Sequence, residues 1–333
     1  MVILYNKKDE NMINLIEYLK QEGINYLKRN KDDKIALIVI SDINDKFINI
    51  IKKSYKPDEI LKEKKANQFM DESRNIDLKG KKAFTNDNFE IIAGPCSVEN
   101  KSQMIEIGNI LSELNINYIR GGAFKPRTSP YQFQGLKERG LELLKNEASQ
   151  HGFNIVTEVM DTESLNMVAE YSDILQIGSR NMYNYSLLKA VGKTDKPVLL
   201  KRGMSATYEE FIMAAEYIYM QGNKNIILCE RGIRTFEQKT RFTLDLMAVP
   251  ILKKLSDYPI IVDPSHGTGR WDLIQPAAEA ALSLGAQGVM VEIHPEPHLA
   301  LSDGYQSLNL NNFYNFVKNI NKKKRNLGQI KDD

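Results

Sequence analysis

Apolar segments of strand length alternate with amphipathic helical segments along most of this chain. From residue 90 onward the pattern predicts eight buried strands, at residues 91–96, 118–123, 155–159, 174–178, 198–201, 226–230, 260–263 and 289–293. The segments between them repeat apolar residues at helical spacing. This alternation predicts an α/β fold, a (β/α)₈ barrel of the TIM type. A doubly wound open sheet is the alternative, but no G-x-G-x-x-G follows any predicted strand, which argues against its dinucleotide-binding form.

The first 65 residues carry a different pattern. Short strand-like segments surround two helical segments, residues 10–22 and 47–51, in the order β-α-β-β-α-β. This is the order of a small ferredoxin-like α+β domain. Residues 66–80 are polar and predict a linker, and residues 82–92 predict a hairpin that turns at Asn86-Asp87-Asn88. We therefore expect a small domain at 1–65, a linker at 66–80, and a barrel with an N-terminal hairpin at 81–333.

Composition narrows the class of protein. The chain has 333 residues, of which 42% are hydrophobic and 26% charged, and its net charge is +2. A charge so close to zero gives no reason to expect nucleic acid or an anionic membrane as a partner, so an anion site would have to be built locally. No apolar stretch is long enough to span a bilayer, and we expect no signal peptide. Two cysteines make no disulfide framework, so we expect a cytoplasmic protein.

The predicted strand ends carry most of the candidate chemistry, as expected for a barrel whose active site lies at the carboxyl ends of its strands. One set of side chains there is cationic. It comprises Lys125, Arg127, Arg180, Lys201 and Arg231, together with Arg120 inside the second strand. Like charges that converge cost free energy unless an anion neutralises them. The set therefore predicts a site for more than one phosphate or carboxylate group, with an ordinary solvated surface as the alternative.

A second set of strand-end residues offers metal-binding atoms. It comprises Cys96, His266, Glu292 and Asp303. A thiolate, an imidazole and two carboxylates suit a borderline divalent metal such as Mn, Fe, Co or Zn. The residues are far apart along the chain, so only the register of a closed barrel would bring them together. Without that register they are scattered structural residues. His294 follows the same strand as Glu292, and the sequence leaves open whether it supports such a site.

Several of these segments together resemble one family. The segments are residues 93–99, 120–130, 177–180, 200–203, 229–232, 263–266, 291–295 and 301–304. They resemble 3-deoxy-D-arabino-heptulosonate-7-phosphate (DAHP) synthase, and the resemblance covers residues 88–310. The first domain is similar, by pattern alone, to the ferredoxin-like regulatory domain of one branch of that family. The chain departs from the family pattern at residues 267–271, so no contacts are assigned there.

The resemblance implies a reaction and a set of residues that perform it. The family condenses phosphoenolpyruvate with erythrose 4-phosphate, the first step of the shikimate pathway to aromatic amino acids. It implies a divalent metal held by Cys96, His266, Glu292 and Asp303. It implies phosphoenolpyruvate binding by Arg120, Lys125, Ser179, Arg180, Lys201 and Arg231. It implies erythrose 4-phosphate binding along Lys125, Pro126, Arg127 and Thr128, so Lys125, His266 and Cys96 are the expected catalytic residues.

Other readings and further expectations follow from the same residues. A 3-deoxy-manno-octulosonate-8-phosphate synthase shares the barrel but has an Asn-containing loop in place of Lys-Pro-Arg-Thr-Ser at residues 125–129. A catalytically silent ligand-sensing protein is a third reading, although such a protein has no need of all four metal-binding residues. We also expect inhibition by an aromatic amino acid, tyrosine or phenylalanine, through the first domain, and a homotetramer, as the family implies.

Overall fold

The structure is a computed structural model that describes residues 1–7, 9–31, 34–39, 43–61, 76–125, 129, 131 and 133–327. The chain divides into two compact units, Met1–Ser73 and Arg74–Asp333. Each unit has its own hydrophobic core. They are described separately below.

The first unit is a four-stranded antiparallel sheet, as far as residues 1–61 are described, with two helices. Its elements are β1 (Val2–Asn6), α1 (Glu10–Gln21), β2 (Tyr26–Lys31), β3 (Lys34–Val39), α2 (Asp45–Ser54) and β4 (Glu59–Leu61), and the sheet order is β2-β3-β1-β4. Asp9 and Asn44 cap the two helices by accepting hydrogen bonds from backbone N–H groups of the first turn. The apolar stripes of the helices supply Leu15, Leu19 and Ile51 to the core of this unit.

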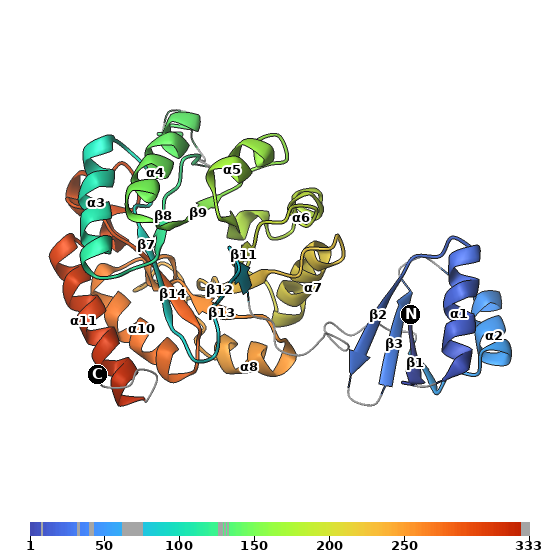
Figure 1. The fold of residues 1–333 in the computed structure, drawn as a ribbon. Helices are drawn as coiled ribbons and strands as arrows, with labels where there is room; N and C mark the ends of the chain where they lie inside the picture. Colours follow the sequence, from blue (N-terminus) through green and yellow to red (C-terminus); the bar gives the residue numbers. More distant parts are fainter. Residues whose placement is uncertain are drawn as a thin grey trace. The chain divides into compact units, whose positions relative to one another are not determined.

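In the part of the second unit that the structure describes, eight parallel strands close into a barrel (Figure 1). The strands are β7 (Glu90–Gly94), β8 (Tyr118–Arg120), β9 (Asn154–Glu158), β10 (Ile174–Ile177), β11 (Val198–Lys201), β12 (Ile226–Glu230), β13 (Ile260–Val262) and β14 (Gly288–Glu292). The barrel closes where β14 pairs with β7. This confirms the predicted (β/α)₈ barrel, with strand bounds within a few residues of those expected.

Helices cover the outside of the barrel, as Figure 1 shows. They are α3 (Lys101–Glu113), α4 (Glu138–His151), α5 (Leu165–Tyr171), α6 (Tyr185–Val191), α7 (Tyr208–Tyr219), α8 (Ala248–Leu255), α10 (Ile274–Ser283) and α11 (Leu310–Asn326). A short helix, α9 (Pro264–Thr268), follows β13 directly. No helix within the described ranges is both long and apolar enough to cross a membrane.

A β-hairpin closes the amino end of the barrel, earlier in the chain than the sequence predicted. Its strands are β5 (Ile76–Leu78) and β6 (Lys81–Ala83), and the backbone N–H of Asp77 donates to Asn225, just before β12. A turn does lie at residues 86–87, where the backbone N–H of Asn88 donates to Thr85 at 3.4 Å, but it does not join the strands of a hairpin. The predicted hairpin at residues 82–92 was therefore misplaced, and residues 76–80 belong to the β5–β6 hairpin and not to a linker. Ile76 and Leu78 are buried and alternate with an exposed Asp77, but the strand is too short to stand out from its polar surroundings.

Candidate active site

A close approach between two strands brings the first predicted site residues together. Gly94 ends β7 with a φ of 155°, and a Cβ placed on it would lie 1.9 Å from the carbonyl oxygen of Arg120. Only glycine permits this packing. The chain then runs on to Cys96, which is 3% exposed, while Arg120 is 4% exposed at the end of β8. Two buried polar side chains therefore begin the site.

Three of the four predicted metal-binding residues lie around one point. The ligand atoms of Cys96, Glu292 and Asp303 lie within 4.8 Å of one another, and the Sγ of Cys96 is 3.3 Å from Oδ2 of Asp303. The fourth residue contacts the group, because Nε2 of His266 is 3.4 Å from Oε1 of Glu292. Barrel closure thus places residues from two strand-end loops, from α9 and from the end of β14 beside each other.

His266 is oriented by Asp263, the residue that caps α9. One carboxylate oxygen of Asp263 accepts the backbone N–H of His266 at 2.9 Å, and the other lies 2.8 Å from Nδ1 of the imidazole. Lys201 donates to that second oxygen at 2.5 Å. Burial lowers the pKa of His266, which favours the neutral ring. With Nδ1–H directed at the carboxylate, the free lone pair of Nε2 faces the Cys96–Glu292–Asp303 cluster.

Glu292 is the fully buried carboxylate of the cluster. Burial alone would raise its pKa, but charge interactions with His266, then with Arg120 and Lys125, hold the pKa at about 2. Nη1 of Arg120 lies 2.5 Å from one oxygen, and the side-chain amide of Gln306 donates to the other at 2.6 Å. The carboxylate is therefore ionised at neutral pH, and it links the metal-binding residues to the cationic set.

The protonation state of the Cys96 thiol depends on burial and on the charges around it. Burial and the nearby Glu292 carboxylate raise its pKa to about 12, so the isolated group is a thiol at neutral pH. Nζ of Lys125 lies 3.0 Å from both the Sγ and the carbonyl oxygen of Cys96. A divalent cation is the partner that would hold a thiolate there. A sulfur and two carboxylates within 4.8 Å of one another, with a lone-pair nitrogen 3.4 Å from one of the carboxylates, fit such an ion.

Two buried cations lack part of their hydrogen bonding. Among the described residues, Nε of Arg120 and Nη1 of Arg231 are buried side-chain nitrogens without a partner. Arg231 is 5% exposed, its guanidinium stacks 4.1 Å from the Phe242 ring, and burial lowers its pKa. An unpaired buried donor costs free energy. Both arginines are therefore arranged for a ligand rich in acceptor oxygens.

The remaining predicted substrate residues differ in placement. Lys201 is buried at the end of β11, Ser179 is half-buried, and Arg180 is exposed on η1 (Ser179–Asn181). Pro126, Arg127 and Thr128 lie outside the described residues.

Sequence reasoning did not single out three residues that complete the site: Asp263, Arg241 and Gln306. Arg241 donates to Oδ1 of Asp303 at 3.3 Å and to the side-chain oxygen of Gln306 at 2.7 Å. Arg241 lies in the long segment between β12 and α8, away from any strand end. Its position along the chain therefore did not indicate that it belongs to the site. Asp263 could have been predicted, because it is an acidic residue at a strand end. The Pro264 that follows it is a common first residue of a helix, which indicates that Asp263 caps one.

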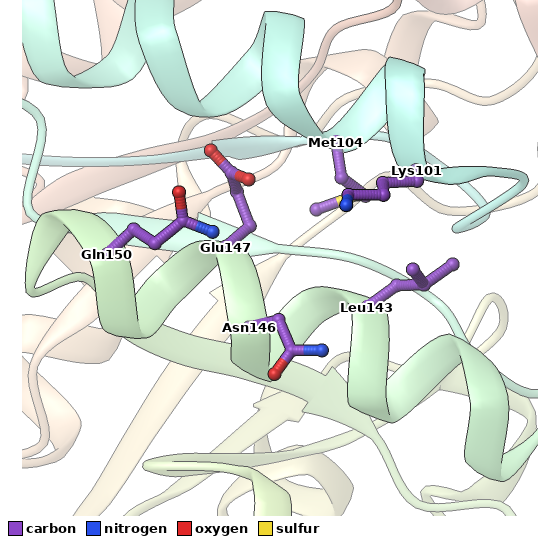
Figure 2. Close-up of a pocket in the computed structure, with 6 residues that line it drawn as sticks. All are labelled: Lys101, Met104, Leu143, Asn146, Glu147 and Gln150. Atoms are coloured by element: carbon purple, nitrogen blue, oxygen red, sulfur yellow. The ribbon is translucent and has the colours of Figure 1, made fainter.

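A groove elsewhere on the barrel is separate from this site. It has a cavity volume of about 390 Å³ and lies between α3 and α4 (Figure 2). Its lining residues are Lys101, Met104, Leu143, Asn146, Glu147 and Gln150. As far as the described residues show, the groove includes none of the predicted site residues.

The fold and the site define a (β/α)₈-barrel enzyme with a centre at the strand ends that is a candidate for binding anions and a metal ion. Residues 72–329 match the DAHP synthetase I family, and the chain belongs to that family. A phospho-2-dehydro-3-deoxyheptonate aldolase of Thermotoga maritima is 54% identical over 255 residues, which are 77% of this chain and 75% of that protein.

Two further relatives extend the comparison. A crystal structure of DAHP synthase from Thermotoga maritima aligns with a TM-score of 0.77 and 43% identity, covering 98% of both chains. A 2-dehydro-3-deoxyphosphooctonate aldolase of Syntrophotalea carbinolica is 29% identical over 249 residues, which are 69% of this chain and 88% of that protein. The first relative agrees with the family indicated by the sequence motifs, and the second represents the rival enzyme class.

Proposed function

We propose that this protein is a DAHP synthase, which condenses phosphoenolpyruvate, erythrose 4-phosphate and water to DAHP and phosphate. The observation that carries the proposal is the 54% identity to a phospho-2-dehydro-3-deoxyheptonate aldolase over the barrel. The buried cations at the strand ends support it, because both proposed substrates are anions and two donors of Arg120 and Arg231 lack protein partners. The activity places the protein at the entry to aromatic amino acid biosynthesis.

We propose that the reaction depends on one divalent metal ion. Cys96, His266, Glu292 and Asp303 would hold it, and their donor chemistry and spacing support this assignment. When bound, such an ion supplies Lewis-acid polarisation of the aldehyde oxygen of erythrose 4-phosphate. Metal analysis of the purified protein would identify the ion among Mn, Fe, Co and Zn.

The cationic side chains would hold the two substrates against their mutual repulsion. Arg120, Lys125, Ser179, Arg180, Lys201 and Arg231 would bind phosphoenolpyruvate. Lys125, Pro126, Arg127 and Thr128 would lie along erythrose 4-phosphate, with Arg127 at its phosphate. Fixed cations that need no rearrangement during the reaction stabilise developing charge and lower the entropy cost of bringing the two anions together.

Lys125 is the proposed proton donor. The methylene carbon of phosphoenolpyruvate forms a bond to the aldehyde carbon, and the aldehyde oxygen takes a proton from Nζ of Lys125. Water then adds to the cationic carbon of the enolpyruvyl group and gives up one proton, which restores the ammonium of Lys125. The C–O bond to phosphate breaks, the remaining hydroxyl proton leaves with the phosphate, and the ketone of DAHP results. Lys125 reaches toward the cluster, with Nζ 3.0 Å from the sulfur of Cys96, which supports its placement where the aldehyde oxygen would lie.

The test is an assay of phosphate release with each aldose phosphate in turn. We expect metal-dependent turnover with erythrose 4-phosphate and at least about 100-fold lower kcat/KM with arabinose 5-phosphate, because a site built for one substrate leaves polar groups unpaired with another. The second candidate, 3-deoxy-manno-octulosonate-8-phosphate synthase, is favoured by the 29% identity to its relative and predicts the reverse preference. If neither sugar phosphate leads to phosphate release, the remaining interpretation is a catalytically silent ligand-sensing protein.

We further propose that tyrosine or phenylalanine inhibits the enzyme through its first unit, in a homotetramer. The separate core of that unit and its two capped helices support a binding role apart from catalysis. Inhibition requires coupling between two sites. Deleting residues 1–73 should abolish inhibition while leaving turnover, and an unchanged amino-acid response after the deletion would refute the proposal. Light scattering would test the tetramer.

A further inference from the structure

Two loops bring Cys96 and Asp303 together, and they are joined by contacts outside the cluster itself. Cys96 lies in the loop between β7 and α3, and Asp303 lies in the loop between β14 and α11. The second loop is closed at its base, because the backbone N–H of His294 donates to Leu308 at 2.9 Å and that of Leu308 donates to Glu292 at 2.9 Å. The position of Asp303 therefore depends on the contacts made by the part of the β14–α11 loop that lies beyond this base.

Glu99 makes that connection. One oxygen of its carboxylate accepts the backbone N–H of Leu301 at 2.8 Å, and the other lies 3.4 Å from Nε2 of His294. Nδ1 of His294 accepts the N–H of Glu296 at 3.0 Å, so Nε2 carries the proton and donates to Glu99. The Glu99 and His294 side chains are only 8% and 10% exposed. One carboxylate thus contacts the loop at its beginning and near Asp303.

A second contact and a rigid base complete the arrangement. The hydroxyls of Ser97 and Ser302 lie 2.7 Å apart and are both buried, directly beside Cys96 and Asp303 in the sequence. Gln103 of α3 accepts the backbone N–H of Glu99 at 2.9 Å and donates to the carbonyl of Ser97 at 3.2 Å. Glu99 is therefore itself anchored to a helix of the barrel, as a support for a precise site requires.

We propose that Glu99 is a positioning residue that holds the β14–α11 loop so that Asp303 stays beside Cys96 in the absence of metal. Its partner is His294, whose role the sequence left open. The inference rests on the proposed metal site. Asp303 adopts a left-handed backbone, with φ 52°, which is unfavourable for a residue other than glycine. Contacts on both sides of Asp303, at Ser302 and at the Ile293–Leu308 pair, oppose relaxation of that conformation.

The chain offers a matched control for the test. Glu147 is also a buried carboxylate beside a histidine, with Oε1 3.0 Å from Nε2 of His151 and a side chain 4% exposed. It lies on α4 in the groove of Figure 2, where it packs against Gly108 of α3, and among the described residues its ion pair is with His151 of the same helix. Glu147→Ala therefore removes the same kind of pair without touching the proposed connection.

The first measurement is hydrogen exchange on the metal-free, full-length protein. Glu99→Ala should speed exchange of the amides in residues 295–307 by at least about tenfold, because the local opening that exposes them becomes easier. Glu147→Ala should leave those amides unchanged, whatever it does to the melting temperature. Equal protection of residues 295–307 in wild type and Glu99→Ala would overturn the proposal.

The second measurement is titration with Co²⁺, followed by the sulfur-to-cobalt absorption band. Glu99→Ala should weaken Co²⁺ binding about 10- to 100-fold, the range found for residues that orient metal ligands. Glu99→Gln should fall between, because its amide keeps one acceptor and turns a donor toward His294. Unweakened Co²⁺ binding by Glu99→Ala would overturn the proposal.

The two failures can be told apart. A wild-type protein that binds no Co²⁺ refutes the proposed metal site. Hydrogen exchange still decides whether Glu99 holds the loop, since that measurement is made without metal.

Discussion

The two ends of the barrel affect a glutamate carboxylate in opposite ways: Glu90 is half-buried and Glu292 fully buried. Glu90 begins β7 at the amino end, and Glu292 ends β14, the neighbouring strand, at the carboxyl end. Burial raises the pKa of Glu90, with Lys324 opposing it only in part. At the other end charge interactions with His266, Arg120 and Lys125 hold the pKa of Glu292 at about 2 in spite of full burial. The ionised form of Glu90 therefore destabilises the fold, whereas the ionised form of Glu292 is stabilised by the charges around it.

The difference extends to the residues around each glutamate. Inside the barrel, the β5–β6 hairpin and the residue after it add Ile76, Leu78 and Phe84 to a cluster of buried apolar side chains. The carboxyl end instead buries Lys201, Arg231 and Asp263. Burial of apolar surface stabilises, while burial of charge costs free energy unless the charge is paired. We expect substitutions at the amino end to change stability and substitutions at the carboxyl end to change activity.

The largest expected effect is that of Lys125→Met. Loss of the proposed proton donor should lower kcat by about 10²- to 10⁴-fold, the usual contribution of general acid catalysis. The melting temperature should change little, because Lys125 is only half-buried. Steady-state kinetics with metal-loaded protein measure the first effect and calorimetry the second. Turnover near the wild-type rate would remove Lys125 from the mechanism.

Phe84→Ala should lower stability and leave activity unchanged, the reverse of what is expected for Lys125→Met. Phe84 is 1% exposed, and its ring packs 5.1 Å from that of Tyr118 inside the barrel. Truncation to alanine should cost about 3–5 kcal/mol of unfolding free energy, through lost burial and the cavity left behind. Denaturant titration measures this cost, and kcat at low temperature should be retained. A loss of kcat in a variant that is still folded would contradict the division between the two ends.

Arg231→Leu tests whether a buried cation at the carboxyl end serves substrate binding and not stability. Burial lowers the pKa of this guanidinium, and one of its nitrogens lacks a protein partner, so its replacement should leave the melting temperature unchanged or higher. The KM for phosphoenolpyruvate should rise about 10- to 100-fold, as for the loss of a charged hydrogen bond. A clearly lower melting temperature together with a normal KM would assign Arg231 to the core.

Glu90→Gln should give the smallest effect, less than about 1 kcal/mol at pH 7, within the range of ordinary substitutions. The pKa of Glu90 is raised in the folded state, so its ionised form destabilises the protein at neutral pH. The glutamine variant should be the more stable at pH 7, and its advantage should disappear as pH falls below about 4.5, the ordinary value for a glutamate. Glutamine keeps the oxygen that accepts from Asn88. An advantage that grows on acidification would contradict this assignment.

Pattern alone predicted the barrel because apolar strands repeat with regular helices between them. The same register predicted that Cys96, Glu292 and Asp303 would converge, since parallel strands place their carboxyl ends at one face. The β5–β6 hairpin was misplaced because a three-residue strand gives little periodic signal. The contacts of Arg241 were not predictable, because its partners, Asp303 and Gln306, lie more than sixty residues away and depend on how two loops meet.

Closure of the barrel by pairing of β7 with β14 has a consequence for biosynthesis of the chain. Cys96 and Arg120 leave the ribosome long before Glu292, the carboxylate that neutralises Arg120. Until the last strand arrives, the first strand has an unpaired edge and the buried arginine has no counter-charge. Long-range pairing of this kind is slow to form. A chain released before β14 is complete therefore lacks both the final strand and the carboxylate that balances Arg120.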